Sequence, residues 1–164
     1  MTWELKPISR EAIPEALEKV ERYRLLNEPA EAESICLDIL EVDPENQSAL
    51  IMLLLSLTDQ FGSGASTSEA LEVIGRLKGD YERAYYRGIV YERAAKWQIR
   101  LGAPGAHFNA YQGLREAMSW YEKAEAIRPS GNDDSILRWN TCARLLSGQA
   151  HVERADEYEP ALEE

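Results

Sequence analysis

The sequence has little of what secreted, membrane-spanning or disulfide-linked proteins require. Its 164 residues include two cysteines, Cys36 and Cys142, which lie far apart; this excludes a disulfide framework and favours a reducing cytoplasm. The longest apolar run, residues 49–57, is less than half of the about 20 residues that a membrane-spanning helix needs. The opening residues MTWELKPISR contain no apolar segment typical of a secretory signal. We therefore expect a cytoplasmic protein.

Positive charge is also scarce. Lysine and arginine number 18 against 29 aspartates and glutamates, which gives a formal net charge of -11. Nucleic acids and anionic membranes bind basic surfaces, so neither is expected as a partner.

The end of the chain, ERADEYEPALEE, carries six acids and one arginine. We expect residues 148–164 to be an acidic, disordered tail; the alternative is that they dock on a basic partner or back on the protein.

Residue patterns that support catalysis or metal binding are missing. The two histidines, His107 and His151, have no metal-ligating residue three or four positions later. The segment GSGAST (62–67) has the composition of a phosphate-binding loop but no Gly-Lys-Ser/Thr. Asn132-Asp133-Asp134 lacks the spacing of a calcium loop and fits a helix cap. We expect no enzyme activity, no catalytic residue, no metal and no cofactor.

What the sequence does contain is a helical spacing that occurs twice. Ala32-x3-Cys36-x2-Ile39-x4-Pro44 recurs as Ala117-x3-Tyr121-x2-Ala124-x4-Pro129, each time with a proline after the helical period. This spacing resembles the second half of the tetratricopeptide repeat, a helix–turn–helix unit of about 34 residues that stacks on copies of itself. Gly88-x2-Tyr91 matches the glycine and tyrosine of the first helix in that family. In such a helix the glycine permits close approach of a neighbouring helix.

The resemblance implies an all-α fold, a right-handed antiparallel helix-hairpin solenoid of about seven helices. Its helical domain would span residues 1–147, with repeats at about 13–46, 47–80 and 81–131 and a capping helix at 132–147. The middle repeat is degenerate, because its loop GSGASTS is long and its second helix EALEVIGRLK is short. A binding module built this way exposes a surface rather than a reaction centre.

The third repeat is longer than the family's period. Apolar residues recur at three or four positions through its second half, at Phe108, Tyr111, Leu114, Ala117, Tyr121, Ala124 and Ile127. This pattern predicts an extended hairpin in which GAPG (102–105) forms the turn. The alternative is a long loop over residues 102–113, which Gly113 would favour.

The resemblance also implies a concave face formed by the first helix of each repeat. The family's positions for partner contact fall here on Leu17, Glu21, Arg24, Ile51, Leu55, Tyr85, Ile89, Glu92 and Arg93. Their aliphatic and aromatic members predict binding of an apolar peptide or helix segment of another protein. Two alternatives remain. Either this face or the extended hairpin mediates self-association, or some of these residues are covered by the hairpin or by the segment MTWELKPI.

One known ligand of the family is not expected here. The family's carboxylate clamp, which holds the C-terminus of a chaperone, needs lysine, asparagine and arginine at five positions. This sequence has Leu17, Glu21, Met52, Glu82 and Tyr86 there. Glu21 and Glu82 would repel a carboxylate.

Overall fold

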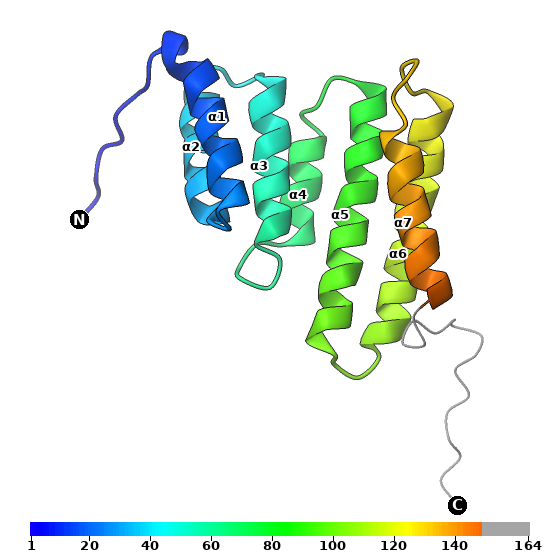
Figure 1. The fold of residues 1–164 in the computed structure, drawn as a ribbon. Helices are drawn as coiled ribbons and strands as arrows, with labels where there is room; N and C mark the ends of the chain where they lie inside the picture. The colour runs from blue at the N-terminus through cyan, green and yellow to red at the C-terminus, as the bar shows by residue number, and fades with distance from the viewer. Residues whose placement is uncertain (149–164) are drawn as a thin grey trace, which may run out of the picture. The chain divides into compact units, whose positions relative to one another are not determined.

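The computed structural model describes residues 1–148, and within them the protein is helical, with seven α-helices, one short 3-10 helix (Arg10–Ala12) and no β-strand (Figure 1). This confirms the predicted all-α class and the expected number of helices. The chain forms two compact units: unit 1, Met1–Lys78, and unit 2, which begins at Gly79. The prediction for the acidic tail falls almost wholly on residues 149–164, outside the described residues.

Unit 1 consists of four helices whose starts are encoded locally. They are α1 (Ile13–Leu25), α2 (Pro29–Val42), α3 (Gln47–Asp59) and α4 (Thr67–Ile74). Pro29 opens α2, where its missing N–H costs no hydrogen bond. The Asn46 side chain caps α3 by accepting the Ala49 N–H at 2.9 Å. Ser66 and Glu69 cap each other's backbone at the start of α4.

The core of unit 1 lies between α1, α2, α3 and α4. Each helix packs on the next along the chain, and α1 also packs on α3. The fully buried side chains come from all four helices and include Val20, Ala32, Cys36, Ile39, Leu50, Leu54, Ala70 and Ile74. The apolar run at residues 49–57 belongs to α3 and supplies buried residues of this core, Ala49, Leu50, Leu53, Leu54 and Leu57 among them. In Figure 1, α2 and α4 lie behind α1 and α3.

Unit 2 is built on a long helical hairpin. Its helices are α5 (Asp80–Leu101), α6 (Ala106–Ala126) and α7 (Asp134–Gly148). Gly102 and Gly105 adopt the left-handed conformation, with φ of 64° and 77°, at the two ends of the turn between α5 and α6. Glycine takes this conformation without strain. The GAPG turn is therefore confirmed, and the alternative loop over residues 102–113 is wrong because α6 already begins at Ala106.

Two glycines let α5 and α6 approach each other closely. A Cβ atom on Gly88 would lie 2.4 Å from Cε1 of Tyr121, so the aromatic ring occupies the space of the missing side chain. A Cβ on Gly113 of α6 would lie 3.0 Å from the Cβ of Ala95 on α5. The expected role of Gly88 is thus confirmed, and Gly113 packs in the same way within a helix. Ala117 and Ala124 of α6 are also fully buried.

Some side chains differ from the expected periodic pattern. Phe108, in the first turn of α6, and Ile127, which follows the last residue of α6, are exposed, whereas Leu114, Ala117, Tyr121 and Ala124 are buried. Helix ends extend past their packing partners, so the periodic pattern identifies the helix better than it identifies burial at its ends.

Among residues 1–148, no helix is long and apolar enough to span a membrane.

Candidate functional site

The first five predicted contact residues lie on two helices that pack together in unit 1. Leu17, Glu21 and Arg24 follow one another at helical spacing on α1, and Ile51 and Leu55 do so on α3. Glu21 is exposed, whereas Leu17, Ile51, Leu55 and Arg24 are half-buried. Because α1 packs on α3, these residues belong to one pair of neighbouring helices. We call this set, Leu17, Glu21, Arg24, Ile51 and Leu55, the α1–α3 face.

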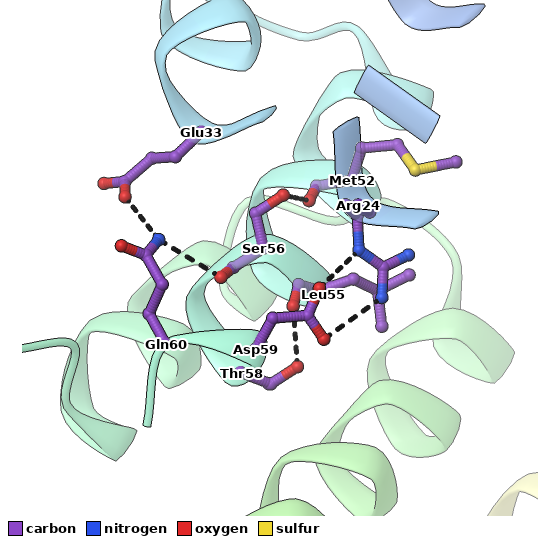
Figure 2. Close-up of polar contacts among 8 residues, drawn as sticks. All are labelled: Arg24, Glu33, Met52, Leu55, Ser56, Thr58, Asp59 and Gln60. Atoms are coloured by element: carbon purple, nitrogen blue, oxygen red, sulfur yellow. Dashed lines mark hydrogen bonds and ion pairs between the residues drawn. The ribbon is translucent and has the colours of Figure 1, made fainter. Parts of the chain in front are cut away.

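An ion pair joins the C-terminal ends of α1 and α3. The Arg24 Nε atom donates to Oδ2 of Asp59 at 2.7 Å, and one of its terminal nitrogens reaches Oδ1 at 3.4 Å (Figure 2). The two side chains are 19% and 21% exposed, so water screens this pair only partly. This bidentate contact fixes the orientation of the guanidinium plane. Arg24 therefore holds α1 against α3 and is already engaged by Asp59.

The last turns of α3 carry further polar contacts. Ser56 and Thr58 are buried, and their hydroxyls donate to the backbone carbonyls of Met52 and Leu55, each at 2.7 Å (Figure 2). Gln60 donates from Nε2 to the Glu33 carboxylate at 2.6 Å, which ties the end of α3 to α2. These groups are satisfied within the unit. Within the α1–α3 face Arg24 is engaged by Asp59, so the side chains left to contact a partner are Glu21 and the aliphatic Leu17, Ile51 and Leu55.

The two cysteines are buried thiols rather than nucleophiles. Burial raises the pKa of Cys36 to about 12, an effect that nearby Arg24 partly opposes and Glu33 adds to. Burial likewise raises the pKa of Cys142 to about 12, and the Glu92 charge adds to the shift. Because the thiolate is the reactive form, neither thiol is activated. Both cysteines are fully buried core residues.

The remaining four predicted contact residues lie on α5 of unit 2. Tyr85 and Arg93 are half-buried, but Ile89 is only 7% exposed and Glu92 is fully buried. Tyr85 stacks on Tyr81, with ring centroids 5.8 Å apart. Ile89 and Glu92 are therefore core residues, and assigning them to an accessible face is wrong. Helical spacing alone does not show which neighbouring helix covers a position, which explains the error.

Glu92 is the centre of a buried ion cluster. Its carboxylate accepts hydrogen bonds from the Tyr121 hydroxyl at 2.6 Å and from Arg138 Nε at 3.1 Å, and it pairs with the Lys96 ammonium at 2.7 Å. A second Arg138 nitrogen donates to the other carboxylate oxygen. Burial opposes ionisation, but the hydrogen bonds from Arg138, Lys96 and Tyr121 outweigh it and lower the pKa of Glu92. The cluster joins α5, α6 and α7.

Part of this cluster has a signal in the sequence. Glu92 and Lys96 stand four residues apart in the order that stabilises a helix. Arg138 lies 46 residues from Glu92, and no local pattern predicts that contact. Tyr121 occupies a repeat position that the sequence marks as apolar; its hydroxyl nevertheless requires a buried acceptor.

Within residues 1–148, no group of three or more histidine, cysteine, aspartate or glutamate side chains is placed to hold a metal ion. No protein-family model matches the chain, and comparisons with curated proteins and with solved structures gave no match. The resemblance to the tetratricopeptide family thus depends on the repeat spacing and remains a prediction.

Proposed function

We propose that this protein is a non-catalytic interaction module, similar to a small tetratricopeptide-repeat protein, that binds an apolar peptide or helix segment of another protein. The observation that carries the proposal is the α1–α3 face, where Leu17, Ile51 and Leu55 keep part of their surface accessible on two helices fixed by the Arg24–Asp59 pair. Aliphatic side chains on a rigid support supply affinity, because few rotamers are lost on binding.

The positions of the helices support the resemblance. Helices α1, α3 and α5 begin at Ile13, Gln47 and Asp80, and each start follows the previous one by about 34 residues, the period of the family. The second helices α2 and α6 carry the two copies of the repeated spacing, and its members Ala32, Cys36, Ala117, Tyr121 and Ala124 are all buried. In unit 2, Tyr85 and Arg93 are the contact positions that stay partly accessible.

The first test changes the centre of the α1–α3 face. We expect Leu55→Glu to weaken binding of a captured partner by about 2 kcal/mol, roughly 30-fold in Kd, because it places a charge where an apolar anchor would bind. Partners are captured from a native lysate with the full-length protein and identified, and the Kd of the purified partner is then measured by calorimetry.

The matched control is Leu25→Glu, which changes an exposed leucine of the neighbouring helix α1. This variant should bind as the unchanged protein does. Circular dichroism of both variants must show the same helix content. If folded Leu55→Glu binds every captured partner with unchanged affinity, the α1–α3 face is not the binding surface.

Exposed apolar residues at the end of the long hairpin favour a second candidate, a structural protein that self-associates. Leu101 and Phe108 flank the turn between α5 and α6, and both expose much of their side chains. Two copies could bury these residues against each other. If so, the mass from light scattering is a multiple of 18.6 kDa, and Phe108→Asp returns it to one chain. A single-chain mass at high protein concentration would exclude this candidate.

A further inference from the structure

Unit 1 also has a groove whose lining residues are separate from the α1–α3 face. It runs between α2 and α4 and has α3 as its floor. Glu33 and Leu37 of α2, Leu53 and Leu57 of α3, and Glu69, Glu72 and Val73 of α4 line a hollow of about 250 Å³. In Figure 1, α2 and α4 lie behind α1 and α3. We call this hollow the α2–α4 groove.

The groove continues into a second hollow beside the N-terminal segment. This one has a volume of about 530 Å³ and is lined by Leu5, Lys6, Pro7, Leu37, Asp38, Leu40, Glu41 and Arg76. Leu37 and Arg76 line both hollows, so they mark where the two meet. The Leu37 side chain is 53% exposed. An accessible leucine between two hollows is an apolar contact point.

Carboxylates surround this contact point. Glu33, Asp38, Glu41, Glu69 and Glu72 line the two hollows, against the cations Lys6 and Arg76. Arg76 donates to the backbone carbonyl of Pro44 at 2.9 Å, so its donors are turned partly away from these acids. Among the described residues, Asp38, Glu41 and Glu72 form no ion pair. The border of the groove therefore carries an excess of negative charge, because five acidic side chains line it against two basic ones.

We propose that the α2–α4 groove binds a basic amphipathic segment of another protein, with an apolar side chain against Leu37 and flanking lysine or arginine beside Asp38, Glu41 and Glu72. Apolar contact supplies the anchor and opposite charge selects the partner. The protein's own acidic end, ERADEYEPALEE, does not suit this groove, because its carboxylates would meet the same sign of charge. A second copy of the chain, with a net charge of -11, is disfavoured for the same reason.

The test uses two synthetic helical peptides with the full-length protein. One peptide alternates leucine and lysine at helical spacing, and the other has glutamate in place of every lysine. We expect the lysine peptide to bind, the glutamate peptide to bind at least about tenfold more weakly, and salt to weaken the lysine peptide, because exposed charges are screened. Fluorescence anisotropy with labelled peptides gives both Kd values.

Matched variants locate the binding site. Leu37→Lys should raise the Kd of the lysine peptide at least about tenfold, whereas Leu137→Lys, which adds the same charge at a leucine 61% exposed on α7, should leave it within about twofold. Glu72→Lys should weaken binding more than Glu18→Lys, a change at an exposed acid of α1. If circular dichroism shows that Leu37→Lys has lost helix content, the same binding measurement is made with Leu37→Asn in its place.

Five results would overturn the proposal. Two concern the peptides: the lysine peptide does not bind, or both peptides bind equally. Two concern the variants: Leu37→Lys and Leu137→Lys lose binding equally, or the wild-type protein is a dimer that Leu37→Lys separates, which would make a second copy the occupant. The fifth concerns the other face of unit 1. The α1–α3 face is tested independently, because Leu55→Glu should leave the lysine peptide's Kd unchanged. If Leu55→Glu abolishes this binding, the peptide occupies the α1–α3 face and the groove proposal is wrong.

Discussion

Replacing Glu92 with glutamine is expected to lower the free energy of unfolding by about 3 kcal/mol, the largest effect that we expect from a single change in this protein. The change keeps the shape of the side chain but removes the charge on which Arg138, Lys96 and the Tyr121 hydroxyl converge. Breaking a buried pair costs more than its net contribution, because the partners lose their compensation. Lys96 and Arg138 keep about a third of their side chains exposed, which places the effect at the lower end of the range. Urea denaturation followed by circular dichroism measures it.

The control for Glu92 is another glutamate–arginine pair of unit 2. Glu125 and Arg128 approach to 3.7 Å with 44% and 34% of their side chains exposed. Glu125→Gln should change the free energy of unfolding by no more than about 1 kcal/mol, as is usual for exposed pairs. Equal effects of the two changes would mean that the Glu92 cluster does not stabilise unit 2 more than a surface pair does.

The same cluster predicts how stability depends on pH. Burial raises the pKa of Glu92, but the hydrogen bonds from Arg138, Lys96 and Tyr121 outweigh it, so the folded value lies below the ordinary 4.5. The unfolded glutamate therefore binds a proton at higher pH than the folded one. The stabilising contribution is complete above pH 4.5 and is lost as pH falls through the folded pKa. The difference in stability between wild type and Glu92→Gln should accordingly shrink below pH 4.5.

Replacing Gly88 with alanine is expected to lower the free energy of unfolding by about 2 kcal/mol. The new Cβ would lie 2.4 Å from the Tyr121 ring, which is fully buried and held at its hydroxyl by Glu92. Overpacking of this kind costs up to about 3 kcal/mol. The higher helix propensity of alanine returns about 1 kcal/mol. Thermal unfolding by circular dichroism provides the measurement, and near-ultraviolet circular dichroism reports whether the tyrosine environment has changed.

Two other glycines serve as controls for Gly88. Gly113→Ala places a Cβ 3.0 Å from the Cβ of Ala95, so a smaller loss is expected. Gly148→Ala meets no atom within 4 Å and should change stability little. A melting temperature for Gly88→Ala at or above that of the unchanged protein would show that α5 and α6 do not pack as closely as described.

The sequence by itself determined the local structure of this protein. Helical periodicity and the GAPG turn are local patterns that predict the long hairpin of α5 and α6. The proline-ended spacings carry the family resemblance, which implies the all-α class and the number of helices. Gly88 was predictable as a point of close helix approach, because only a residue without a side chain permits it. Caps such as Asn46 and the Ser66–Glu69 pair act within a few residues, so they too can be read from the chain.

Only the tertiary structure decided which predicted contact residues remain accessible. Glu92 and Ile89 share a helix with Tyr85 and Arg93, yet α6 and α7 supply Tyr121 and Arg138 to Glu92 and make it a core residue. Leu37, by contrast, lies in an apolar sequence and stays exposed beside the α2–α4 groove. Residue spacing defines the faces of one helix, whereas accessibility depends on which other helices pack against each face. Those contacts join residues far apart in the chain, so no local pattern encodes them.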